Sequence, residues 1–265
     1  MKLGFVGGGL MGEAILAGAL QKKLTSPSDI AVSEIVPARR EHLTSTYGVS
    51  AEESADEALK ADIVVLAVKP QEFGKAAGSL EGRMGSHQTV MSIMAGVRIE
   101  TIKKAMGHDA VARAIPNTAA QVGESMTVWT ASPEVSDEAR EAVSSLLAVL
   151  GQELYVSDEK YVDMATAVAG SGPAYVFLVM EAMIDAAVHI GLRRDQAETM
   201  VKQTLYGSSL YARETGRHPA VLRNEVTSPG GTTAEALRVL EEAAVRAAFT
   251  DAIEAAFDKS KALGS

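Results

Sequence analysis

The sequence predicts an α/β fold, with a doubly wound parallel sheet in the N-terminal part followed by an all-helical C-terminal domain. Short β-branched runs alternate with amphipathic segments as far as about Tyr155, and strand signals stop after it. Strands that alternate with helices are typical of parallel βαβ units. A chain of 265 residues is long enough for two modest domains. We expect them at residues 1–158 and 159–265.

The elements of the first domain follow from this alternation. β-branched runs predict strands at residues 3–6, 30–33, 63–68, 89–93, 110–115, 126–130 and 153–156. Amphipathic stretches predict helices at residues 11–22, 38–47, 71–80, 99–106 and 137–150. In the second domain Gly and Pro punctuation predicts helices at residues 173–191, 195–214 and 233–263.

The composition excludes several kinds of chemistry. The absence of cysteine removes disulfides, thiolate nucleophiles and sulfur-ligated metals. The 5 histidines form no close pair, so we expect no metal site. A net charge of -9 argues against a nucleic-acid partner. The reactive group of an enzyme with this composition is therefore expected to belong to a bound molecule.

The sequence also predicts a cytoplasmic protein with no membrane partner. The N-terminus has no signal-peptide pattern, because its lysine is followed at once by a strand-like run and glycines. We find no apolar stretch of the roughly 18 residues that a membrane span needs.

A glycine-rich loop follows the first predicted strand. Gly7, Gly8, Gly9, Leu10, Met11 and Gly12 form a G-x-G-x-x-G between a strand and a helix. In this context the glycines allow a tight turn, close approach of a pyrophosphate and packing of the helix on the strand. The loop predicts a site for NADPH or NADH.

The end of the second predicted strand bears on the choice of coenzyme. Ser33 and Glu34 lie there, and a carboxylate at this position binds the ribose 2′-hydroxyl and repels a 2′-phosphate, which favours NADH. Arg39 and Arg40 offer the alternative of pairing with the 2′-phosphate of NADPH, although arginines on a helix surface are more often solvated. Use of both coenzymes stays open.

Further cofactor contacts are expected just after later strands, because ligands of open α/β sheets bind at the carboxyl ends of the strands. The candidates are Val68, Lys69, Pro70, Ala95, Gly96 and Asn117. Each is also compatible with an ordinary turn. We interpret Lys69 as lining the cofactor site rather than as a catalytic lysine.

A second glycine-rich loop precedes the last predicted helix. It contains Ser228, Gly230 and Gly231, and Thr232 with Glu235 fits a capping box. A helix N-terminus presents free N–H groups and a positive dipole end, which suits a carboxylate. The alternatives are an anion site and an ordinary capped helix.

The helix predicted at residues 173–191 is apolar on most of its circumference. Such a helix needs cover from several sides, and a domain of this size hardly provides it. A second subunit is the hypothesis that follows.

Taken together, these motifs resemble the pyrroline-5-carboxylate reductase family over essentially the whole chain. The resemblance rests on the first glycine loop and on residues 67–70, 95–97, 114–118, 170–175 and 222–233. It implies a Rossmann domain followed by a helical dimerisation domain, in homodimers that commonly assemble into decamers. It also implies reduction of L-1-pyrroline-5-carboxylate to L-proline by NADPH or NADH, the last step of proline biosynthesis.

The resemblance also assigns roles in the second loop. It implies that Ser228 and the backbone of Gly230, Gly231 and Thr232 hold the substrate carboxylate, and that the Thr233 hydroxyl is the catalytic group at the ring nitrogen. Glu34 departs from the family, where a small polar residue is common. Hydride transfer to an imine needs a positioned cofactor and substrate, but no protein nucleophile or metal.

Two other functions remain as alternatives. β-Hydroxyacid dehydrogenases share this layout but use a lysine in the long helix as general acid, whereas no lysine occurs here between Gly170 and Lys202. A non-catalytic dinucleotide-binding protein would have no need of the second loop.

Overall fold

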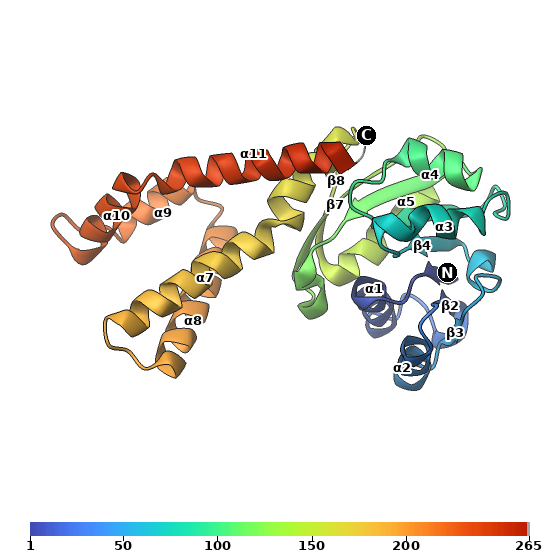
Figure 1. Ribbon diagram of the computed structural model, residues 1–265, viewed down its shortest axis with the longest axis horizontal. Coiled ribbons are helices and arrows are strands. Elements are labelled where there is room, and N and C mark those ends of the chain that lie inside the picture. The colour runs from blue at the N-terminus through green and yellow to red at the C-terminus, as the bar shows by residue number, and fades with distance from the viewer. Residues whose placement is uncertain (264–265) are drawn as a thin grey trace. The chain divides into compact units, whose positions relative to one another are not determined.

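The computed structural model describes residues 1–263 and divides into two compact units. The first contains Met1–Ser171 together with the end of the chain from Ala256, and the second is Gly172–Ala255. Figure 1 shows strands in the first unit and helices alone in the second.

An eight-stranded sheet forms the centre of the first unit, in the order β3-β2-β1-β4-β5-β6-β7-β8. Every neighbouring pair is parallel except β6 and β7. The strands are β1 (Leu3–Val6), β2 (Ile30–Ser33), β3 (Ser50–Glu52), β4 (Ile63–Leu66), β5 (Thr89–Ser92), β6 (Val111–Ile115), β7 (Ser125–Ala131) and β8 (Gly151–Tyr155).

All the predicted strands are present, with ends that differ by one or two residues. The edge strand β3 was not predicted, because Ser50–Glu52 contains no apolar run. The sheet is mostly parallel, as predicted, and the exception is the antiparallel pair of β6 and β7. Only a short 3-10 segment, Thr118–Val122, joins these strands, and a parallel crossover needs a dozen or more residues.

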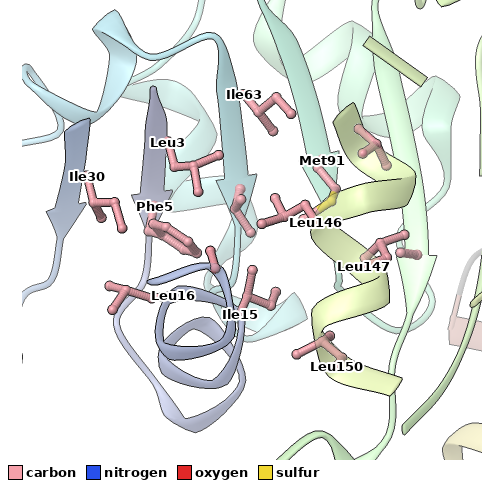
Figure 2. Close-up of a cluster of buried hydrophobic side chains, with 14 of the residues drawn as sticks. Leu3, Phe5, Ile15, Leu16, Ile30, Ile63, Met91, Leu146, Leu147 and Leu150 are labelled. Atoms are coloured by element: carbon pink, nitrogen blue, oxygen red, sulfur yellow. The ribbon is translucent and has the colours of Figure 1, made fainter. Parts of the chain in front are cut away.

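Helices cover both faces of the sheet. Alternate residues of β4 point to opposite sides of the sheet. Ile63 and Val65 belong to the apolar cluster that also contains residues of α1 (Leu10–Gln21) and α5 (Asp137–Leu147), and Figure 2 labels Ile63 in this cluster. Val64 and Leu66 pack with α3 (Phe73–Gly78) and α4 (Ile99–Met106). This burial on both faces confirms the doubly wound fold. The remaining helices of this unit are α2 (Pro37–Tyr47) and α6 (Lys160–Ala165).

The second unit is all-helical, as predicted. Its helices are α7 (Gly172–His189), α8 (Arg194–Thr215), α9 (Pro219–Glu225), α10 (Thr232–Glu242) and the larger part of α11 (Val245–Leu263). The prediction of one helix over 233–263 is wrong, because the chain breaks at Ala243 and Ala244, where Ala244 has φ 54°. Alanine is the best helix former, so local propensity does not indicate this break.

The longest continuous helical segment corrects a second expectation. Lys160–His189 is 30 residues long and contains an 18-residue window with a mean hydropathy of 1.5, so it is long and apolar enough to cross a membrane by length and composition alone. The expectation that no such stretch exists is therefore wrong. An apolar helix that packs against protein on all sides meets the same criterion, so the segment alone does not distinguish the two surroundings.

Candidate functional site

The first glycine loop has the geometry that a dinucleotide site requires. Gly7 has φ 100°, and a Cβ there would lie 2.8 Å from the backbone of Ala67. A Cβ on Gly12 would lie 2.8 Å from the Gly7 carbonyl oxygen, so α1 packs closely on the loop. Gly9 precedes α1 and has no atom within 4 Å of its Cβ position, which leaves room for a ligand at the helix N-terminus.

A pocket of about 740 Å³ opens beside this loop at the carboxyl ends of β1, β2 and β4. The order of the sheet reverses at β1, because β2 lies on one side of it and β4 on the other. Such a switch point is where open α/β sheets bind their ligands. The pocket brings together seven of the predicted cofactor residues, namely Gly7, Gly9, Leu10, Ser33, Glu34, Val68 and Lys69.

Glu34 is buried at the wall of the pocket and both of its carboxylate oxygens accept backbone hydrogen bonds. Oε2 accepts from the N–H of Gly8 at 2.8 Å, and Oε1 accepts from the N–H of Val36 at 2.8 Å. Ser33 donates its hydroxyl to the carbonyl of Glu53 at 3.1 Å. These bonds fix the carboxylate beside the glycine loop.

The two arginines of α2 are held by the protein itself. Arg39 donates from Nε and Nη2 to the Gly8 carbonyl at 3.1 and 2.6 Å, and Nη2 also contacts Glu13 at 2.6 Å. Arg40 donates to the carbonyls of Glu34 and Ile35 at 2.7 and 3.0 Å. Neither arginine has the solvated position that is usual on a helix surface.

The remaining candidate residues lie outside the lining of the pocket. Gly8 belongs to the loop itself, Met11 and Gly12 lie in the first turn of α1, and Pro70 begins the 3-10 segment Pro70–Glu72 before α3. Ala95 is exposed. Gly96 is buried with φ 75°, and a Cβ there would lie 2.7 Å from Cβ of Leu263, so the loop after β5 packs on the end of α11.

Asn117 is engaged in the fold through its side chain. Its Oδ1 accepts from the N–H of Ala119 and its Nδ2 donates to the carbonyl of Ala169, each at 3.1 Å. The second bond reaches the π-helical turn Thr166–Gly170, and such turns often occur at functional sites. Asn117 therefore connects the end of β6 to the segment that leads into α7.

A buried ion-pair cluster surrounds Arg113, four residues before Asn117 in the sequence, and was not predicted from the sequence. Arg113 of β6 is fully buried and contacts Glu159 at 2.8 Å and Asp163 at 2.7 Å. Glu159 also accepts from the N–H of Ile99 at 2.8 Å. A charged residue in the middle of a β-branched run was the available signal, since such a residue needs a buried partner.

The second glycine loop folds as a tight turn before α10. The N–H of Gly231 donates to the carbonyl of Ser228 at 3.0 Å, and Gly230 has φ 67°. Proline at the second position and a glycine of positive φ at the third are the requirements of a type II turn. Pro229 and Gly230 meet them, so the sequence specifies this turn locally.

The capping box predicted at this helix is wrong. Gly231 is the N-cap, and no side chain within residues 1–263 caps the helix, while Glu235 pairs with Arg238 at 2.6 Å. The first N–H groups of α10 therefore lack a side-chain acceptor and remain available for an anion. Thr233 is half-buried, and within residues 1–263 its hydroxyl has no hydrogen-bond partner. Ser228 and Thr232 are exposed beside it.

Comparison with known proteins shows similarity over the whole chain. A family model described as pyrroline-5-carboxylate reductase dimerisation matches residues 159–263, and one described as NADP oxidoreductase, coenzyme F420-dependent, matches residues 2–96. A pyrroline-5-carboxylate reductase of Synechocystis is 39% identical over 100% of this chain and 98% of its own length.

Solved structures agree with this result. A pyrroline-5-carboxylate reductase from Coxiella burnetii has a TM-score of 0.90 at 33% identity, covering 100% of this chain and 98% of that one. A Plasmodium falciparum pyrroline carboxylate reductase with NADP bound has a TM-score of 0.90 at 30% identity, with the same coverage.

Proposed function

The chain belongs to the pyrroline-5-carboxylate reductase family, and we propose that its two glycine-rich loops hold the two reactants of that reaction. It is an NAD(P)H-dependent oxidoreductase that reduces L-1-pyrroline-5-carboxylate to L-proline in proline biosynthesis. The loop at residues 228–233 is the main support for giving each loop one reactant. A protein that only binds a dinucleotide would not need this second loop.

The pocket beside the first loop suits the coenzyme. The open space at Gly9 allows a pyrophosphate to approach the N-terminus of α1, where free N–H groups and the helix dipole attract it. Glu34 offers a fixed carboxylate to a ribose hydroxyl, and Lys69 adds a positive charge to the lining. NAD(P)H, when bound, supplies the hydride that reduces the imine carbon.

The second loop suits the substrate. The carboxylate of pyrroline-5-carboxylate is an anion, and the unoccupied N–H groups at the start of α10 with the exposed hydroxyl of Ser228 are donors for it. The Thr233 hydroxyl, which has no hydrogen-bond partner among residues 1–263, hydrogen-bonds the ring nitrogen. Reduction adds a hydride to the imine carbon and a proton from water to the nitrogen. No protein nucleophile takes part.

The chain forms an oligomer through its helical domain, and we propose that the basic assembly is a homodimer. Val176, Phe177 and Leu178 on α7 are 50%, 59% and 66% exposed in the single chain. A second copy of α7 offers the apolar cover that these side chains lack. Sedimentation is expected to give a dimer, or a decamer built from it, and a monomer at micromolar concentration would contradict the proposal.

The test of the function is direct. The purified protein is mixed with pyrroline-5-carboxylate and NADH or NADPH, and the loss of nicotinamide absorbance is followed. We expect oxidation of the coenzyme with formation of proline in equal amount, detected by chromatography. No oxidation with either coenzyme would refute the proposed roles of both loops.

A further inference from the structure

Glu34 faces the adenosine end of the coenzyme pocket as a fixed negative charge. Its two carboxylate oxygens are bound to the N–H groups of Gly8 and Val36, and the residue is 9% exposed. These bonds prevent the side chain from rotating away when a second anion approaches. A 2′-phosphate carries about −1.5 to −2 charges and would meet this carboxylate at the end of β2.

A phosphate in this position normally binds an arginine, and the nearest arginines are already engaged. Arg39 would have to give up its two bonds to the Gly8 carbonyl and its ion pair with Glu13. Arg40 would have to leave the carbonyls of Glu34 and Ile35. Bonds from a guanidinium to a carboxylate are among the strongest in proteins, so this exchange is unfavourable.

Glu13 is the charged partner that holds Arg39 in place, together with the Gly8 carbonyl. It lies in the first turn of α1 with 15% of its side chain exposed, and it accepts hydrogen bonds from Arg39, His42 and Tyr47. Burial raises the pKa of Glu13, but the three hydrogen bonds outweigh burial and keep that pKa below its ordinary value. The carboxylate is thus ionised at neutral pH, whatever coenzyme is present.

We propose that Glu13 and Glu34 together select the coenzyme and make NADH the preferred reductant of this chain. Glu34 excludes the 2′-phosphate by charge, and Glu13 withholds the arginine that would otherwise neutralise it. The proposal rests on the binding of NAD(P)H in this pocket and adds the preference between the two coenzymes.

The lining of the pocket also contains cations that bear on this balance. Lys75 and Arg83 line it from α3 and the turn that follows, and Arg83 pairs with Asp56. Lys75 is exposed and has no ion-pair partner among residues 1–263. Lys75, like the exposed Lys69 of the same lining, is therefore a cation available to a 2′-phosphate if the preference ran the other way.

The experiment measures dissociation constants for NADH and NADPH by titration calorimetry in the absence of substrate. We expect the wild-type protein to bind NADH about tenfold or more tightly than NADPH, the effect of one charged hydrogen bond. Glu34→Ser is expected to reverse the ratio, because it removes the repulsion and a ribose contact together.

Glu13→Gln tests the less obvious half of the proposal. It keeps the shape of the side chain but replaces the ion pair with Arg39 by a weaker, neutral hydrogen bond, so Arg39 exchanges more readily onto a phosphate. The dissociation constant for NADPH is therefore expected to fall several-fold while that for NADH stays within about twofold. The gain should be larger in the Glu13→Gln/Glu34→Ser double variant than in either alone, because Arg39 binds the phosphate best once the repelling carboxylate is gone. Tyr47→Phe is the matched control, since it removes another bond to Glu13 and leaves Arg39 in place.

The outcomes separate this proposal from the proposed function. Tight NADH binding without reduction of pyrroline-5-carboxylate would refute the function and leave the coenzyme selection standing. If the wild-type protein bound NADPH more tightly than NADH, the proposed selection would be refuted. If Lys75→Gln then abolished the tighter binding of NADPH, the 2′-phosphate would be bound by Lys75 of α3. An unchanged ratio in Glu13→Gln, or the same change in Tyr47→Phe, would remove Glu13 from the mechanism.

Discussion

The two units of the chain bury their apolar residues to very different extents. In the first unit the strands β1, β4 and β5 are buried along their whole length, and two clusters of apolar side chains fill both sides of the sheet. In the second unit the buried cluster consists of Ile184, Ala197 and Val201. The first unit therefore contains its own core, whereas the second leaves large apolar side chains of α7 exposed in the single chain.

A charge on α7 is expected to have the largest effect of any single substitution. Leu178 is 66% exposed in the chain, so Leu178→Glu would be harmless in a monomer. At an interface the same glutamate is buried without a partner, which costs about 3 to 5 kcal/mol and separates the subunits. Analytical ultracentrifugation and thermal unfolding measure the two consequences.

The matched control lies in the first unit. Val122 is 77% exposed in the connection between β6 and β7, so Val122→Glu should leave both the sedimentation coefficient and the melting temperature unchanged. If Leu178→Glu behaved like Val122→Glu, α7 would not be an interface, and the contrast between the two units would need another explanation.

A core substitution in the first unit should lower stability without separating the subunits. Leu146 of α5 is fully buried in the cluster of Figure 2. Leu146→Ala is expected to lower the free energy of unfolding by about 2 to 5 kcal/mol, through lost burial and the cavity left behind. The oligomer should persist below the transition, because the sheet unit makes its own core. Dissociation at low temperature would show instead that the two units depend on one another.

The substrate loop of the second unit provides a test of intermediate size. Thr233→Ala should lower kcat/KM by about 1 to 3 kcal/mol, the effect of deleting one hydrogen bond to the substrate, with the melting temperature unchanged. Thr232→Ala is the control, because the neighbouring Thr232 offers its backbone N–H rather than its hydroxyl. Steady-state kinetics with pyrroline-5-carboxylate distinguishes the two, and equal losses would argue against a specific role of the Thr233 hydroxyl.

The parts of the fold that were predictable are those set by local pattern. Strands of β-branched residues stand out because both of their faces are buried, and the turn at Pro229 and Gly230 is encoded in its own residues. The edge strand β3 and the break at Ala244 carry no such signal. Their conformations are decided by neighbours in space rather than by propensity.

The residues of the candidate site likewise fall into those that the sequence predicts and those that it does not. The glycine loop and Glu34 were found from spacing, since each glycine answers a local steric demand. The partners of Arg39 could not be found from the sequence, because Gly8 and Glu13 lie 31 and 26 residues away along the chain. Arg113 was overlooked for a similar reason, as its carboxylate partners come from the distant segment around α6.

The smallest expected effects concern the pH dependence of stability, through one acidic residue in each unit. The pKa of Glu13 lies below its ordinary value of 4.5, so the folded state binds this proton less readily than the unfolded state. Its stabilisation is complete above pH 4.5 and is lost as the pH falls through the lower folded-state pKa. Glu13→Gln should remove a contribution of less than about 1 kcal/mol and flatten the acid limb of the stability curve.

The corresponding group in the second unit is Glu235, whose pKa is also lowered, by its hydrogen bond to Arg238. This pair is open to solvent, with side chains 68% and 52% exposed, so water and salt screen it. Glu235→Gln should therefore change the acid limb less than Glu13→Gln, and added salt should abolish what change there is. Urea unfolding between pH 3 and pH 7 measures both, and equal effects would mean that the partial burial of Glu13 does not strengthen its interactions.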